Sequence, residues 1–152
     1  MNEAETTTIG KVVSIWRYPV KSMLGEELNS SYITEHGLIG DRVYALIDQE
    51  TGKVISAKNP SKWGMLFDFR SAFIDQPQVV DNIPPAVRIT FPDGTQIFSN
   101  QNEINHTLSN VLHREVKLIR NSLEKPIYEF LLLLSVFSIF AFYSLKSNLA
   151  IL

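Results

Sequence analysis

Two stretches near the start of the chain decide the fold: KVVSIWRYPVKSMLGEEL at residues 11–28 and GLIGDRVYALIDQETGKVISAKNPSKW at residues 37–63. Both are rich in alternating and β-branched residues, which is typical of short strands. Pro19 marks the end of the first strand, because proline lacks the N–H that a ladder requires. Further along the chain, residues 92–94 (Pro-Asp-Gly) separate two more alternating segments, as in a hairpin. These patterns predict a mainly β domain.

Working outward from these stretches gives an α+β, β-rich domain over residues 9–120, with a barrel-like or strongly curved antiparallel sheet. The turn at residues 49–52 predicts a second hairpin, with glycine in the left-handed position. The expected strands are residues 11–18, 26–34, 42–48, 53–57, 63–74, 87–91, 95–99 and 115–120, and the expected helix is residues 101–113 with Asn100 as its cap.

Composition excludes several classes of function. The net charge of −2 argues against nucleic acid as the main partner. The absence of cysteine excludes disulfides, zinc-finger spacings, thiolate nucleophiles and cysteine-ligated metals within these 152 residues. The sequence also lacks a Walker loop, a dinucleotide fingerprint and a clustered-carboxylate metal site. The function therefore has to be sought in individual polar residues at strand ends.

The C-terminal part of the chain has a different composition. Residues 127–145 read IYEFLLLLSVFSIFAFYSL, and no charge occurs over residues 130–145. A membrane-spanning helix needs about 20 apolar residues, with about 17 as the lower limit. The alternative is a long buried helix, but no polar face appears at helical spacing. The sequence therefore predicts a transmembrane helix over residues 127–145.

This prediction carries an orientation and a domain plan. Cations are more numerous before the apolar segment than after it, so the positive-inside rule places the folded domain in the cytoplasm. The cations before it are Arg114, Lys117, Arg120 and Lys125, and only Lys146 follows. We expect residues 1–8 to be disordered, residues 121–126 to form a linker and residues 146–152 a short tail. If the apolar segment is instead a core helix, a plain cytoplasmic protein is expected.

Three residues are candidates for an anion site. Lys21 and Ser22 follow the rigid turn at Pro19, and ammonium, hydroxyl and backbone N–H groups are the donors that hold an oxyanion. Arg42 follows a Gly-x-x-Gly turn, and its planar guanidinium suits phosphate or carboxylate. The plain alternatives are a solvated lysine beside a turn serine, and a local ion pair between Arg42 and Asp41. The residues alone leave these alternatives open.

The same motifs carry a family resemblance. WRYPVKSMLGEEL at residues 16–28, GLIGDRVYALID at residues 37–48 and SAKNPSKW at residues 56–63 resemble the N-terminal β-barrel domain of MOSC proteins. That family takes its name from the C-terminal domain of molybdenum cofactor sulfurase and includes amidoxime-reducing components and related oxidoreductases. The resemblance implies that Lys21, Ser22 and Arg42 contact the molybdenum cofactor (molybdopterin), with no catalytic residue and no metal ligand in this chain.

One departure from the family qualifies what the chain does alone. The family's molybdenum-ligating cysteine belongs to the MOSC domain, and these residues contain no cysteine. The chain thus resembles a truncated member, expected to be inactive alone and to need a MOSC domain from another chain. The competing interpretations are a membrane-tethered binding or scaffold module without redox activity, attached through residues 127–145, and a non-functional fragment.

Overall fold

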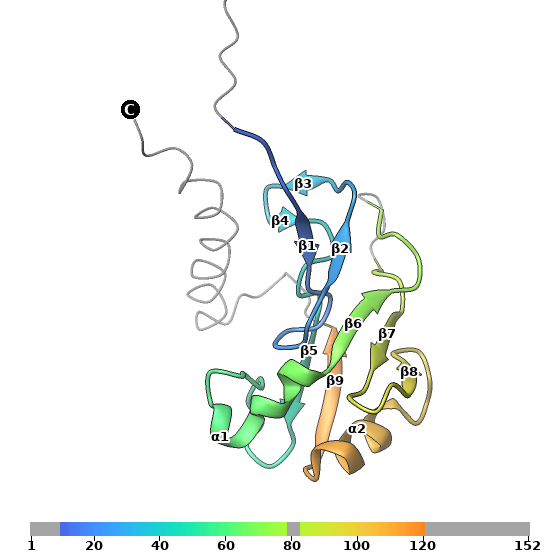
Figure 1. The fold of residues 1–152 in the computed structure, drawn as a ribbon. Coiled ribbons are helices and arrows are strands. Elements are labelled where there is room, and N and C mark those ends of the chain that lie inside the picture. Colours follow the sequence, from blue (N-terminus) through green and yellow to red (C-terminus); the bar gives the residue numbers. More distant parts are fainter. Residues whose placement is uncertain (1–9, 79–82, 121–152) are drawn as a thin grey trace, which may run out of the picture. The chain divides into compact units, whose positions relative to one another are not determined.

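The computed structural model describes residues 10–78 and 83–120 of the chain (Figure 1). Ile15 begins the compact unit that holds every element named below. The expected β-rich character is confirmed, because short antiparallel strands outnumber the helices in the described residues. These strands form small separate sheets, and the largest sheet within the described ranges has three strands.

The first sheet pairs β1 (Ile15–Arg17) with β2 (Glu26–Leu28), and Arg17 lies opposite Glu26. Both strands are shorter than predicted, since the first begins at Ile15 instead of residue 11 and the second ends at Leu28 instead of residue 34. A small hairpin follows, in which β3 (Ile33–Thr34) pairs with β4 (Gly37–Leu38). The loop between β1 and β2 carries the first candidate motif, and the loop after β4 carries the second.

The second main sheet pairs β5 (Tyr44–Asp48) with β9 (Val116–Arg120), two segments that the sequence analysis predicted as strands. The turn after β5 has Gly52 in the left-handed region, at a φ of 67°, as expected. Its second arm is weaker than predicted, with one antiparallel bridge between Ile47 and Val54 in place of a full strand.

The three-stranded sheet has the order β6 (Arg70–Phe73), β7 (Val87–Thr90), β8 (Gln96–Phe98). The predicted hairpin at residues 92–94 is confirmed, with β7 and β8 antiparallel and Gly94 at a φ of 86°.

The predicted strand over residues 63–74 is wrong in its first half. Residues there form α1 (Pro60–Trp63) and the 3-10 helix η1 (Gly64–Asp68), and only β6 is extended. Proline at the first helical position favours a helix start. The side chains that face inward are Trp63, Leu66 and Phe69. Their spacing of three residues matches the three residues per turn of a 3-10 helix, not the alternation of a strand.

The predicted helix is confirmed as α2 (Ile104–Leu112), which lies beside β9 (Figure 1). Its inward stripe contains Ile104, Leu108 and Leu112, in agreement with the sequence pattern. The predicted cap is wrong, since the residue before the helix is Glu103 and it makes no capping bond. The helix is instead tied at its other end, where the Ser109 hydroxyl accepts a bond from the Val116 N–H at 3.0 Å.

The predicted barrel is not a closed one in the part of the chain that the structure describes. Single parallel bridges, Val20 to Tyr44 and Leu24 to Arg70, join the loop after β1 to β5 and β6. A continuous ladder is interrupted there because Pro19 has no N–H and Ser22 has a φ of 69°. The apolar side chains of the loop after β1, of β5 to β9 and of the helices share one core, in which Phe69 meets Phe91 edge to face at 5.4 Å.

The predicted transmembrane segment, residues 127–145, lies outside the described residues, as do residues 1–8, 121–126 and 146–152. Within residues 10–78 and 83–120, no helix combines the length and the apolar character that crossing a bilayer requires.

Candidate anion-binding site

The two candidate motifs lie side by side, joined by backbone hydrogen bonds. The Lys21 N–H donates to the Tyr44 carbonyl at 2.9 Å, and the Tyr44 N–H donates to the Pro19 carbonyl at 3.0 Å. One step earlier, the Arg42 N–H donates to the Tyr18 carbonyl at 2.8 Å. The two segments therefore run parallel, although about twenty residues separate them in the sequence.

Lys21 and Ser22 both reach the segment that follows the β5 turn. The Lys21 Nζ donates to the Ile55 carbonyl at 3.1 Å, and the Ser22 Oγ accepts the Ala57 N–H at 3.1 Å. The Ser22 hydroxyl is an acceptor in that bond, so its own O–H can still donate. Both residues are half-buried. This end of the site therefore presents an ammonium and a hydroxyl close to the same short segment.

Arg42 is held by its neighbours in the second motif. Its Nη1 lies 3.0 Å from Asp41 Oδ2, and its Cζ lies 5.9 Å from the centroid of the Tyr18 ring. Its side chain is 16% exposed, so the guanidinium is largely but not fully covered. The local ion pair considered in the sequence analysis is thus present, and a cation–π contact accompanies it.

Asp41 links Arg42 to the first motif. Its Oδ1 accepts the Tyr18 N–H at 2.8 Å, while Oδ2 faces Arg42. Burial raises the pKa of the Asp41 carboxyl above its usual range, against the lowering effects of Arg42, the Tyr18 N–H and Arg17. The ionised form of the Asp41 carboxyl is therefore stabilised by these three partners, and loss of any one of them would raise its pKa further.

The backbone at two of the three candidates is unusual. Ser22 has a φ of 69° and Arg42 a φ of 53°, and the left-handed region costs a residue with a side chain about 1–2 kcal/mol. Among the described residues, the other non-glycine residue with a left-handed backbone is His113, at the C-terminal end of α2. Such strain clusters at binding sites, where it fixes the direction of a functional side chain. The sequence offered only one hint of it, the glycines and prolines nearby.

The backbone register separates the two cations. Arg42 lies level with Tyr18, three residues before Lys21, or about 10 Å along the segment. Their recorded side-chain contacts also differ, with Lys21 directed to Ile55 and Arg42 to Asp41. The structure therefore brings the two motifs together, and the convergence of Lys21, Ser22 and Arg42 on one ligand stays a prediction.

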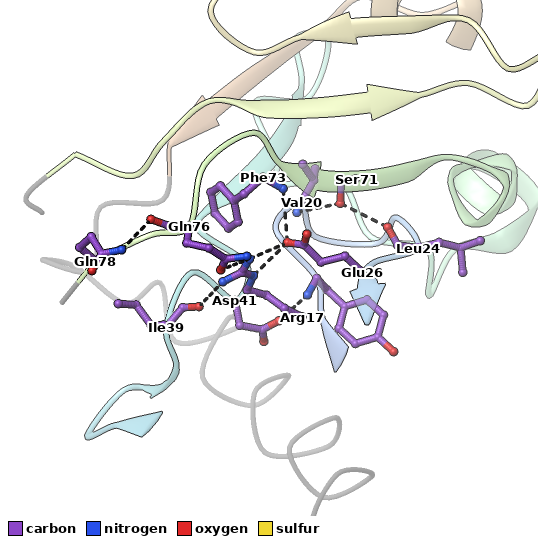
Figure 2. Close-up of polar contacts among 11 residues, drawn as sticks. Arg17, Val20, Leu24, Glu26, Ile39, Asp41, Ser71, Phe73, Gln76 and Gln78 are labelled. Atoms are coloured by element: carbon purple, nitrogen blue, oxygen red, sulfur yellow. Dashed lines mark hydrogen bonds and ion pairs between the residues drawn. The ribbon is translucent and has the colours of Figure 1, made fainter. Parts of the chain in front are cut away.

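Sequence reasoning missed Arg17, the most deeply buried charge near the site (Figure 2). Its Nε and Nη2 lie 2.9 Å from Glu26 Oε1, and its Nη2 donates to Gln76 Oε1 at 3.2 Å. Its guanidinium also lies 4.8 Å from the Phe73 ring centroid. The alternation of the first strand could have revealed the burial of Arg17, because Arg17 falls on the face opposite the exposed Trp16.

No group of three metal-ligating side chains gathers anywhere in residues 10–78 and 83–120.

Comparison with known proteins agrees with the motifs. Residues 9–68 match the family of the MOSC N-terminal beta barrel domain, so the resemblance seen in the sequence is confirmed over this segment. The match contains all three candidate residues and ends with η1. Neither the curated proteins nor the solved structures gave a match to the chain.

Proposed function

We propose that this chain supplies one wall of a binding site for the molybdenum cofactor, with Lys21, Ser22 and Arg42 receiving its phosphate. The MOSC family is linked to that cofactor in general, and residues 9–68 belong to its N-terminal domain. When bound, the cofactor would supply redox or sulfur-transfer chemistry. The residues of this chain would bind and orient its anionic end.

One observation carries the proposal. The parallel pairing of the Tyr18–Lys21 segment with the Arg42–Tyr44 segment puts both motifs in one place on the fold. Ser22 and Arg42 both adopt left-handed backbone conformations in this region. A fold that needed only stability would gain from glycine at these two positions. Retention of serine and arginine there supports a role for their side chains.

The donor set fits the phosphate end of a pterin cofactor. Lys21 and Arg42 bring two positive charges, and Ser22 adds a hydroxyl that can donate. Asp41 forms an ion pair with Arg42, and the Lys21 Nζ donates to the Ile55 carbonyl.

The metal itself would need a further domain. A thiolate is the soft ligand suited to the molybdenum centre, and none occurs in these 152 residues. We therefore propose that a MOSC domain, such as one in another chain, completes the site and performs the reaction.

Cofactor retention tests this proposal. The full chain would be co-expressed with a separate MOSC domain in a host that makes the cofactor, and the complex isolated in detergent. Molybdenum would be counted by mass spectrometry and pterin by fluorescence after oxidation. We expect Lys21→Ala and Arg42→Ala each to lower the retained cofactor about tenfold, the effect of losing one charge-assisted contact.

Matched controls are available on the same fold. Lys58 and Arg88 are exposed, and Lys58→Ala and Arg88→Ala should retain cofactor as the unaltered chain does. Equal retention by all four variants, with the complex intact, would refute the assignment of Lys21 and Arg42.

A second function remains in competition because of the apolar segment at residues 127–145. A membrane-tethered binding or scaffold module would use the same domain without redox chemistry, facing the cytoplasm. Membrane fractionation with carbonate extraction tests the anchor. A chain that stays in the pellet, without cofactor in the retention experiment, would favour the scaffold function over the cofactor site.

A further inference from the structure

We infer that Asp41 is a positioning residue, which holds the Arg42 guanidinium in the direction needed to receive an anion. The inference rests on the proposed function and extends it to a residue that does not itself meet the ligand. Asp41 connects the two motifs through one carboxylate, with Oδ1 on the Tyr18 N–H at 2.8 Å and Oδ2 at 3.0 Å from Arg42 Nη1.

The geometry forms a closed ring of contacts. Tyr18 donates its N–H to Asp41, accepts the Arg42 N–H at its carbonyl at 2.8 Å, and lies with its ring 5.9 Å from the Arg42 Cζ. The guanidinium is thereby held on two sides, by the carboxylate and by the aromatic face.

Asp41 has two opposite effects on an anion at Arg42. Its charge repels the anion, and its hydrogen bond fixes the guanidinium, which otherwise samples many rotamers. If Asp41 only neutralised the charge of Arg42, its second oxygen would not need to accept the Tyr18 N–H. The second bond anchors the carboxylate to the backbone of the motif that carries Lys21 and Ser22. We therefore expect the orienting effect to exceed the repulsion.

Phosphate titration of the full chain in detergent micelles tests this inference. The probe is inorganic phosphate, followed through the ¹H–¹⁵N signals of the Arg42 side chain and of the Ser22 and Ala57 backbone. Asp41→Asn keeps an acceptor for the Tyr18 N–H but removes the charge. We expect it to weaken phosphate binding on the order of tenfold, as loss of an outer orienting group does at other sites. Asp68→Asn, which removes a charge from an exposed acid in η1, should leave binding unchanged.

Unchanged or tighter phosphate binding by Asp41→Asn would overturn the inference and make Asp41 a simple counter-charge. The unliganded protein gives an independent reading. The Arg42 Nε–H signal should be dispersed in the unaltered chain and move toward the random-coil position in Asp41→Asn, with the Tyr18 amide signal retained. An Arg42 signal that does not move would also refute the positioning role.

The Arg42 signal of the unliganded protein distinguishes failure of this inference from failure of the proposed function. If the unaltered chain binds no phosphate, the proposed function fails, and the Arg42 signal still decides whether Asp41 holds the guanidinium. Should Asp41→Asn fail to fold, the unaltered chain can be titrated with acid instead. The Arg42 Nε–H signal should then follow protonation of Asp41. Arg17 and Arg42 are the charged groups that act on this carboxyl. An Arg42 Nε–H signal that does not change when Asp41 is protonated would count against the inference.

Discussion

Two arginine–carboxylate pairs stand close together in this fold and differ in almost every respect. Arg17 is 1% exposed, extends from the regular strand β1, and is bonded to Glu26 and Gln76. Arg42 is 16% exposed, lies in a turn with a φ of 53°, and its carboxylate partner is the preceding residue. The first pair joins two neighbouring strands, and Arg17 also reaches Gln76, 59 residues further along the chain, whereas the second pair joins consecutive residues.

The difference indicates what each pair is for. A buried pair is costly to break, because removal of one partner leaves an uncompensated charge inside the protein. The Arg42–Asp41 pair is also largely covered, with side chains that are 16% and 19% exposed, but its position in a strained turn makes it suited to directing the guanidinium. We therefore interpret Arg17 as structural and Arg42 as functional.

The largest effect is expected at the buried pair. Arg17→Met should lower the free energy of unfolding by about 3–5 kcal/mol, because the Glu26 carboxylate loses its partner in a side chain that is 17% exposed. Denaturant unfolding of the full chain measures this loss. The double variant Arg17→Met/Glu26→Gln should recover much of it, since the neutral amide can still accept the Phe73 N–H. A single variant as stable as the original would show that the pair is not structural.

A smaller loss is expected in the turn that carries Arg42. Gly40 has a φ of 81°, and an added Cβ would lie 2.7 Å from the Phe73 ring and 2.9 Å from Pro77. Gly40→Ala should therefore lower the free energy of unfolding by about 2–3 kcal/mol. Gly52→Ala is the matched control, because its φ is 67° but nothing lies within 4 Å of the added carbon. We expect it to cost about 1 kcal/mol, and equal losses would mean that the turn can adapt.

The smallest loss is expected at a third ion pair, which offers a reference for the other two. Lys62 Nζ lies 2.7 Å from Asp48 Oδ2, and this bond, followed by the Glu50 N–H, holds the pKa of Asp48 below its usual range despite burial. A depressed carboxyl pKa contributes stability above the unfolded-state pKa, and that contribution is lost as the pH falls through the folded-state pKa.

Because Lys62 is 24% exposed and Asp48 keeps the bond from the Glu50 N–H, Lys62→Met should cost about 1–2 kcal/mol at neutral pH and less at a pH well below 3.8, the usual pKa of aspartate. Unfolding curves at the two pH values check this result. A cost that is independent of pH would assign the effect to packing of Lys62 on the Trp63 ring, which lies 5.2 Å away, instead of to Asp48.

These contrasts also show how far sequence reasoning could go. Turn chemistry predicted the glycines at positions 52 and 94, and alternation predicted β5 and β9, because both signals are local. The first half of the strand predicted at residues 63–74 is wrong, because a run of apolar residues fits the periodicity of a strand and of a helix alike. In the structure the buried residues are three apart, which is the spacing of the 3-10 helix η1. The link between Asp41 and Tyr18 depends on the tertiary pairing of two loops, which no local pattern contains.

The candidate site was predictable in part. The motifs identified Lys21, Ser22 and Arg42, and the family match over residues 9–68 supports the motifs. The left-handed conformations of Ser22 and Arg42 and the burial of Arg17 could be seen only in the structure, because each depends on what packs around the residue.

The most direct test of this account is a calorimetric titration of the full chain, in detergent, with inorganic phosphate. Arg42→Met should lower the phosphate affinity about tenfold, while the free energy of unfolding should fall by less than the ~3–5 kcal/mol expected for Arg17→Met, because Asp41 keeps its bond from the Tyr18 N–H. Arg88→Met, at an exposed position of β7, should change neither quantity. Phosphate affinity that is the same in Arg42→Met as in the unaltered chain would contradict the division between a structural and a functional arginine.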